Sequence, residues 1–185
     1  MAVGLFGGAF DPPHLGHVAV VQAAKDAFGL PRLTVLVSAA PGHKGVDAPA
    51  EARVELARAA FPGEEVRLDP YPRTIDLLRA MRFDDPLFVI GADEFCDFPA
   101  WQEPDAVLEL TRIAVATRPG FPPERLDAVL RAVRQPERVV FFDIEPNPAA
   151  SREIRSLAAA GKPLDGLVPP AVAALIVERG LYRGD

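Results

Sequence analysis

Short, predominantly apolar runs place the strongest constraint on the fold of this chain. They occupy residues 2–6, 33–37, 87–90, 113–116 and 139–142, with a weaker run at 66–68. Because successive side chains of a strand point to opposite faces, such runs are typical of parallel sheets covered on both sides. Segments with helical spacing alternate with them, at 14–28, 49–61, 75–82, 104–110 and 123–133. We therefore predict an α/β protein with a Rossmann-like, doubly wound parallel sheet of five to six strands and helices on both faces.

The length of 185 residues predicts a single domain, residues 1–185. Its last part, from about residue 150, is expected to be helical, with segments at 151–160 and 170–179. Each of these segments is followed by a glycine, Gly161 or Gly180, which is a common residue just past the end of a helix.

Composition excludes several classes of function. The net charge of −6 argues against a nucleic-acid partner, because nucleic-acid-binding domains present a basic face. No apolar run has the length needed to span a bilayer, so no membrane association is expected. Cys96 is the only cysteine, which rules out an internal disulfide framework and a cysteine-based zinc site. We expect a cytoplasmic protein that is a monomer or a small homo-oligomer.

The first apolar run ends at two adjacent glycines, and two of the three histidines follow in the stretch GGAFDPPHLGH, residues 7–17. Glycines let a ligand approach the backbone, and a helix start offers unpaired N–H groups and a partial positive charge. This combination predicts an anion site, most often for phosphate. Asp11 is a candidate cap for the helix, and a helix that begins near His14 places His14 and His17 on one face.

Two other interpretations of these histidines stay open. A zinc site would need more ligands, and His43 is the only other histidine. Ordinary packing of two imidazoles in a first helical turn is the plainer alternative. The glycines do not form the G-x-G-x-x-G dinucleotide fingerprint. Unusual residues also follow the second and fourth strands, at His43-Lys44 and Gly91-Ala92-Asp93, and the carboxyl ends of parallel strands share one sheet edge.

Residues 7–17 resemble the G-G-[ST]-F-[DN]-P-x-H-x-G-H signature of the nucleotidyltransferase superfamily with the H-x-G-H motif. The resemblance is greatest to its bacterial nicotinate-nucleotide adenylyltransferase branch, since the phosphopantetheine branch usually has Thr in place of His14. Further segments are similar to that branch, in the same order along the chain. They are PGHK at 41–44, TIDLL at 74–78, GAD at 91–93 followed by Phe98 and Trp101, and RPG at 118–120. The last two are VPP at 168–170 and Gly180-Leu181-Tyr182.

The resemblance implies transfer of the adenylyl group of ATP to nicotinate mononucleotide, giving nicotinate adenine dinucleotide and pyrophosphate in NAD biosynthesis. Its implied partners are ATP and a pyridine mononucleotide. Mg²⁺ would accompany ATP, held through the substrate phosphates rather than by protein ligands. The alternatives are a sister adenylyltransferase that uses nicotinamide mononucleotide or another phosphate acceptor, a non-catalytic nucleotide-binding module, and a zinc-dependent hydrolase, which lacks ligands.

The same resemblance implies roles for individual residues. His14, His17 and Lys44 would be catalytic. The ATP-binding residues would be Gly7, Gly8, Ala9, Phe10, His14, His17, Ser151, Arg152 and Arg155, so the C-terminal helical portion would contribute to the ATP site. Gly91 and Asp93 would bind the ribose. The nicotinate would be bound by Thr74, which is also a candidate helix cap, by Trp101, which would stack on the pyridine ring, and by His43.

Some positions depart from the pattern of the branch. Ala9 stands in place of Ser or Thr, and Arg73 stands before Thr74 where Tyr is common. The stretch I-S-S-T-x-I-R corresponds to residues 149–155, which keep one hydroxyl at Ser151 and the final Arg155. Because the other hydroxyls are missing, we expect Arg152 or Arg155 to supply the lost interaction with the ATP phosphates.

Overall fold

The computed structural model describes residues 3–41 and 45–183, and six strands of this part of the chain form one parallel sheet. The strands are β1 (Val3–Gly8), β2 (Leu33–Ser38), β3 (Glu65–Asp69), β4 (Pro86–Gly91), β5 (Arg112–Thr117) and β6 (Val139–Asp143). Their order in the sheet is β3-β2-β1-β4-β5-β6, with every neighbouring pair parallel. The predicted fold class and strand number are confirmed. Successive strands are added in one direction from β1 to β3 and in the other from β4 to β6, so the strand order reverses between β1 and β4, the usual place for a ligand crevice.

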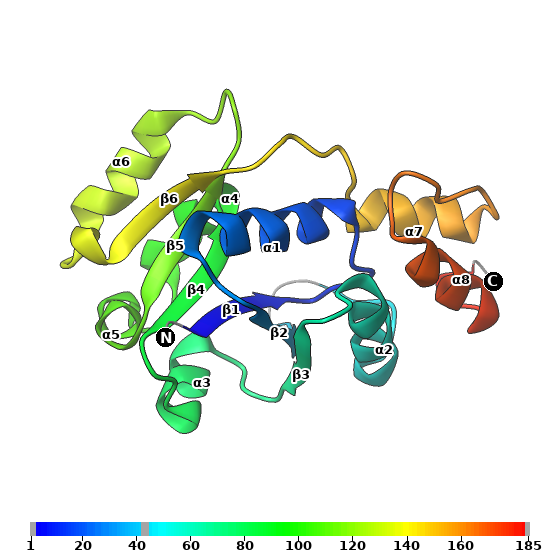
Figure 1. Ribbon diagram of the computed structural model, residues 1–185, viewed down its shortest axis with the longest axis horizontal. Helices are drawn as coiled ribbons and strands as arrows, with labels where there is room; N and C mark the ends of the chain where they lie inside the picture. The colour runs from blue at the N-terminus through cyan, green and yellow to red at the C-terminus, as the bar shows by residue number, and fades with distance from the viewer. Residues whose placement is uncertain (1–2, 42–44, 184–185) are drawn as a thin grey trace.

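Helices cover both faces of this sheet (Figure 1). The helices of the described residues are α1 (Leu15–Phe28), α2 (Ala50–Ala60), α3 (Thr74–Met81), α4 (Ala92–Asp97), α5 (Pro104–Leu110), α6 (Pro123–Ala132), α7 (Ser151–Ala159) and α8 (Pro170–Glu178). Two short 3-10 turns, Phe98–Ala100 and Pro136–Arg138, complete them. Helices α1 and α2 pack on one face, and α3 to α6 pack on the other.

Neighbouring residues of β1 show how both faces become buried. Leu5 belongs to the apolar cluster beneath α3 to α6, whereas Phe6 belongs to the cluster beneath α1 and α2. Both side chains are buried. The predominantly apolar runs of the sequence therefore correspond to strands that contribute to two hydrophobic cores at once.

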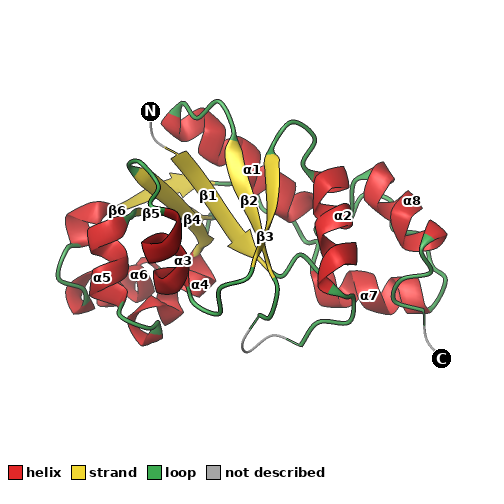
Figure 2. Cartoon of the chain, turned by 90° about the horizontal axis from the view of Figure 1, so that it is seen from below, coloured by secondary structure: helices red, strands yellow, loops and turns green. Residues whose placement is uncertain are grey.

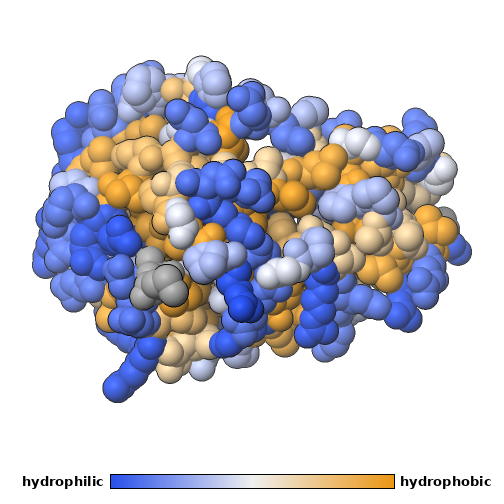
Figure 3. Space-filling model, in the orientation of Figure 1, coloured by the Kyte–Doolittle hydropathy of each residue, from blue (hydrophilic) through white to orange (hydrophobic). Residues whose placement is uncertain are grey.

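Helices α7 and α8 extend the molecule beside α2 rather than covering β5 and β6 (Figure 2). The Leu15 N–H donates to the Leu167 carbonyl at 2.9 Å, which joins the start of α1 to this C-terminal portion. Apolar side chains reach the surface over this portion (Figure 3), and Val177 is 68% exposed. The C-terminal portion thus lies next to the histidine-containing turn although it is far from it in sequence.

Three details differ from the sequence prediction. Helix α4 and the turn after it were not predicted, because six residues are too few to show helical periodicity. Thr74 is the first helical residue of α3 rather than its cap, since the carbonyl of Arg73 already accepts the first helical hydrogen bonds, from Asp76 and Leu77. Asp11 does not cap α1, because its carboxylate accepts from backbone N–H groups of another loop.

Candidate active site

The two histidines of the opening stretch lie together at the start of α1. Their rings stack with centroids 3.7 Å apart and an interplanar angle of 29°. His14 occupies the cap position with an extended backbone. Its backbone N–H donates a hydrogen bond to Nδ1 of the His17 ring at 3.2 Å. The prediction that His14 and His17 share one face of the helix start is confirmed.

His14 is held in its neutral form. Burial lowers its pKa from 6.5 to about 4, because a charged imidazole would lose its hydration there. Its Nδ1 is buried, and no group of the described residues forms a hydrogen bond with it. An arriving phosphate would reverse this preference, since an anion beside the ring favours the protonated imidazole.

Gly16 makes room for the ring of His14. A Cβ atom at this position would lie 3.0 Å from two atoms of the imidazole, closer than side chains normally pack. The glycine between the two histidines is therefore explained by packing within the first turn of α1. It allows the His14 ring to fold back over that turn.

The segment before the histidines is fixed by aromatic packing. Phe10 has a positive φ of 49° and is buried, and its ring meets that of His17 edge-on at a centroid distance of 5.2 Å. A Cβ atom at Gly8 would come within 3.0–3.2 Å of the Phe10 ring. The side chain of Phe10 is thus part of the core, which leaves only its backbone groups for a nucleotide.

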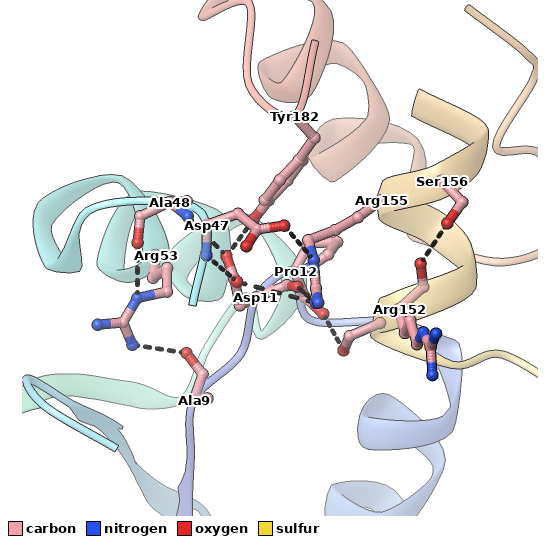
Figure 4. Close-up of polar contacts among 11 residues, drawn as sticks. Ala9, Asp11, Pro12, Asp47, Ala48, Arg53, Arg152, Arg155, Ser156 and Tyr182 are labelled. Atoms are coloured by element: carbon pink, nitrogen blue, oxygen red, sulfur yellow. Dashed lines mark hydrogen bonds and ion pairs between the residues drawn. The ribbon is translucent and has the colours of Figure 1, made fainter. Parts of the chain in front are cut away.

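Asp11 is the centre of a buried polar network that joins three distant segments (Figure 4). Its carboxylate accepts hydrogen bonds from the N–H groups of Asp47 at 2.7 Å and Ala48 at 3.1 Å. It also accepts one from the hydroxyl of Tyr182 at 2.8 Å. Burial, together with this bond to Asp11, raises the pKa of Tyr182. Asp11 thereby ties the loop after β1 to residues 47–48 and to the end of the chain.

Arg53 of α2 also connects these loops, through hydrogen bonds to their backbone carbonyls. This role was not predicted from the sequence. Its side chain is 1% exposed and donates only to backbone carbonyls. The acceptors are Ala48 at 3.1 Å, Ala9 at 2.8 Å, Ser38 at 2.7 Å and Ala39 at 3.2 Å. The sequence does contain a signal for this role. Arg53 precedes Ala57 by four positions and Ala60 by seven, which places its charge on the core-facing side of α2.

The three predicted phosphate ligands of the C-terminal portion have different surroundings. The hydroxyl of Ser151 donates to the Pro12 carbonyl at 2.9 Å. Arg155 donates to the Asp47 carboxylate at 2.7 Å and to the Asp11 carbonyl at 2.8 Å, so it is already engaged. The Arg152 side chain is exposed, and no described residue pairs with it. Arg152 is therefore the guanidinium of this set that is free for an anion.

A cavity of about 510 Å³ opens beside the end of β1. It is lined by Gly7, Gly8 and Ala9 from the glycine turn, by Thr74 of α3, and by Trp101 from the loop after α4. Three separate segments that the sequence singled out therefore meet in one hollow. Trp101 is held there by edge-on contacts with Phe98 at 5.2 Å and Phe88 at 6.4 Å.

The remaining predicted residues lie elsewhere or outside the described part. Gly91 ends β4, and Asp93 is exposed in the first turn of α4, where it pairs with Arg118 at 3.4 Å and Arg125 at 3.9 Å. Neither Gly91 nor Asp93 lines the cavity. His43 and Lys44 lie outside the described residues.

Two features are absent from residues 3–41 and 45–183. No group of three or more His, Cys, Asp or Glu side chains is arranged to hold a metal ion. No helix in these ranges combines the length and apolar character needed to cross a membrane.

Known proteins resemble the chain over almost its whole length. The family model described as cytidylyltransferase-like matches residues 5–157. A protein of Thermus thermophilus named as a probable nicotinate-nucleotide adenylyltransferase is 36% identical over 195 residues, covering 99% of this chain and 100% of its own length. A protein of the same name from Rubrobacter xylanophilus is 34% identical over 200 residues, covering 100% of this chain and 94% of its own length.

A solved structure shares the fold. The nicotinic acid mononucleotide adenylyltransferase of Plasmodium falciparum, complexed with NaAD, superposes with a TM-score of 0.74. The match covers 98% of this chain and 97% of the other, at 16% sequence identity.

Proposed function

We propose an activity from one premise: the chain belongs to the cytidylyltransferase-like family. Its relatives at 34–36% identity are named nicotinate-nucleotide adenylyltransferases. The chain is accordingly a nucleotidyltransferase that transfers the adenylyl group of ATP to nicotinate mononucleotide, releasing pyrophosphate and giving nicotinate adenine dinucleotide. The alternative acceptors are nicotinamide mononucleotide or another compound with a phosphate group, such as phosphopantetheine.

One observation carries this proposal: the segment 7–17 contributes both to the wall of the cavity and to the pair of stacked histidines. At their start, Gly7, Gly8 and Ala9 line the cavity that contains Trp101. At their end, His14 and His17 stack at the beginning of a helix. A mononucleotide in the cavity and a triphosphate at the histidines would therefore meet along a single backbone segment, as a transfer between two bound nucleotides requires.

The reaction needs alignment and charge neutralisation rather than a covalent intermediate. An oxygen of the mononucleotide phosphate forms a bond to the α-phosphorus of ATP. The bond from this phosphorus to the oxygen that bridges it to the β-phosphorus breaks, and pyrophosphate leaves with the electron pair. His14 and His17 would donate hydrogen bonds to the phosphate oxygens, with His17 nearer the α-phosphate and Lys44 as a further cation. Mg²⁺ would enter as part of the ATP substrate, because it binds readily through phosphates and keeps several waters.

The other residues would hold the two substrates. Gly7, Gly8, Ala9 and Phe10 would contact ATP through their backbone groups, and Ser151, Arg152 and Arg155 would contact its phosphates. Gly91 and Asp93 would bind a ribose. Thr74, Trp101 and His43 would contact the pyridine ring and its carboxylate, with Trp101 stacking on the ring. A cytoplasmic location and a monomeric or small oligomeric state stay predictions.

The test is an acceptor survey. The purified chain is incubated with ATP and Mg²⁺ and, separately, with nicotinate mononucleotide, nicotinamide mononucleotide or phosphopantetheine, while pyrophosphate is quantified. We expect the fastest release with nicotinate mononucleotide and its near-complete loss in His17→Ala. Absence of pyrophosphate with every acceptor would overturn the enzymatic proposal, and a clear preference for phosphopantetheine would overturn the acceptor.

A further inference from the structure

Arg73 lies on the wall of the cavity next to Thr74. It occupies the cap position of α3 with an extended backbone, and it is one of the residues that line the cavity, between Pro72 and Thr74. This residue departs from the branch that the chain resembles, in which Tyr is common at this position. The proposed roles of the site residues leave Arg73 without one.

The charges of this cavity are unequal. Among the described residues that line it, Asp69 and Glu94 are acidic and Arg73 is the one cation. Asp69 accepts a hydrogen bond from the N–H of Tyr71 at 2.9 Å, and burial raises its pKa. Two carboxylates in a confined space repel an anionic ligand, so an anionic ring would be admitted only where a positive charge faces it.

Arg73 has no carboxylate partner of its own. The charge of Arg73 acts on Glu103, whose pKa is lowered mainly by a hydrogen bond from Arg79 and to a smaller extent by the charge of Arg73. Both oxygens of Glu103 are already occupied by the Arg79 guanidinium, at 3.0 and 2.7 Å. Within residues 3–41 and 45–183, no acidic group lies within 4 Å of the Arg73 guanidinium. Its donors are therefore available to a ligand in the cavity.

We propose that Arg73 is a specificity-determining residue that pairs with the carboxylate on the pyridine ring of the acceptor and so selects the acid over the amide. The inference rests on the proposed function, because it assigns the ring to this cavity. A guanidinium can bind a carboxylate through two parallel hydrogen bonds, and it gains no such pair from a neutral carboxamide. Nicotinate and nicotinamide mononucleotides differ only at this group, so the Arg73 contact would separate them.

The test measures kcat/KM for both mononucleotides in the wild-type chain and in Arg73→Gln. We expect a 10- to 100-fold fall for the nicotinate substrate, roughly the value of hydrogen bonds to a charged group, and less than a threefold change for the nicotinamide substrate. Arg73→Lys should keep part of the preference, since it keeps the charge without the two-pronged geometry. The reaction with the nicotinamide substrate also reports that the variant is folded.

Arg82→Gln is the matched control. It removes the same charge from the other end of α3, where the side chain is exposed and does not line the cavity. This variant should leave both kcat/KM values unchanged. An equal fall for the two substrates in Arg73→Gln would overturn the inference, because it would assign Arg73 to the phosphate or ribose they share. An unchanged preference would overturn it as well. If the wild-type chain turns over neither substrate, the proposed function fails rather than the role of Arg73.

Discussion

The segments that follow β1 and β4 each contain an aspartate that pairs with arginine, but the two aspartates lie in opposite surroundings. Asp11, after β1, is 3% exposed and accepts three hydrogen bonds from groups of other segments. The Asp93 side chain, after β4, is 69% exposed and meets Arg118 and Arg125 at 3.4 and 3.9 Å. The charge is the same, whereas the degree of desolvation differs greatly.

The difference in desolvation affects how firmly the segments around Asp11 and Asp93 are held. Buried polar groups are costly when unpaired, so the Asp11 network allows the loop after β1 essentially one arrangement. Exposed ion pairs are weak and are screened by salt, so the first turn of α4 gains little stability from the pairs that Asp93 forms. The loop before His14 is thus fixed before a ligand arrives, while Asp93 can change partners on binding.

The largest expected effect comes from removing the buried guanidinium beneath the loop after β1. Arg53→Met leaves four backbone carbonyls without their donor, and the free energy of unfolding should fall by about 3–5 kcal/mol. Arg58→Met, an exposed arginine on the same helix, is the matched control and should cost less than about 0.5 kcal/mol. Urea unfolding measures both. Equal losses would mean that the carbonyl contacts contribute nothing.

The second effect concerns catalysis beside this fixed loop. His17→Ala should lower kcat by about 10²–10³-fold, the usual loss when a group that stabilises transition-state charge is removed. Its thermal midpoint reports the separate structural loss, because the His17 ring also accepts a hydrogen bond from the His14 backbone and packs against Phe10. Asp93→Asn should mainly raise KM, and by less than tenfold. The rate of pyrophosphate release with nicotinate mononucleotide as the acceptor measures these values. A larger loss of kcat in Asp93→Asn than in His17→Ala would contradict the contrast between the two segments.

The third effect is a dependence of stability on pH. In the folded chain burial lowers the pKa of His14 from 6.5 to about 4. Between these values the unfolded chain binds a proton that the folded chain does not, so the free energy of unfolding falls as the pH decreases through this window. The slope is at most about 1.4 kcal/mol per pH unit, and it vanishes above pH 6.5. His14→Gln should lose this component in urea titrations at several pH values. A variant profile parallel to that of the wild type would contradict it.

A smaller loss is expected at the other end of the Asp11 network. Tyr182→Phe removes the hydroxyl that donates to Asp11 and should cost about 1–2 kcal/mol of unfolding free energy. Tyr71→Phe is the control, because no described residue accepts from its hydroxyl. A difference between the two variants below about 0.3 kcal/mol would show that this contact is not stabilising.

The smallest effect should come from the exposed pair after β4. Arg118→Ala is expected to change the free energy of unfolding by less than about 0.5 kcal/mol, and less still at high salt. Thermal unfolding at low and high salt measures it. A loss as large as that of Tyr182→Phe would remove the distinction between the surroundings of Asp11 and Asp93.

The fold could be predicted from the sequence because its information is local. Each apolar run contains the evidence that its strand is buried on both faces, and the intervening periodicity marks the helices. The glycine turn, Thr74 and Trp101 were predicted as site residues, and the structure gathers them in one cavity because the carboxyl ends of parallel strands meet there. Helix α4 escaped prediction because six residues display less than two helical turns.

The contacts of Asp11 and Arg53 could not be predicted, for a different reason. Asp11 precedes a proline near a helix start, which is locally the pattern of a cap, yet its partners are 36 to 171 positions away. Local sequence contains no mark of which distant loop will supply a donor. Arg53 was detectable only as a charge on the core side of a helix, and the carbonyls it satisfies belong to strand ends elsewhere.

The hydrogen bond between Asp11 and Tyr182 can form only late in synthesis of the chain, since the two residues are 171 positions apart. At about 5–20 residues added per second, a ribosome produces Tyr182 on the order of 10–30 s after Asp11. The strands from β1 to β6 can pair during that interval. The turn that precedes the histidines gains its last partner only afterwards. A nascent chain could therefore acquire its sheet well before it acquires a finished nucleotide site, and binding of ATP would report synthesis of the segment that contains Tyr182 rather than the onset of folding.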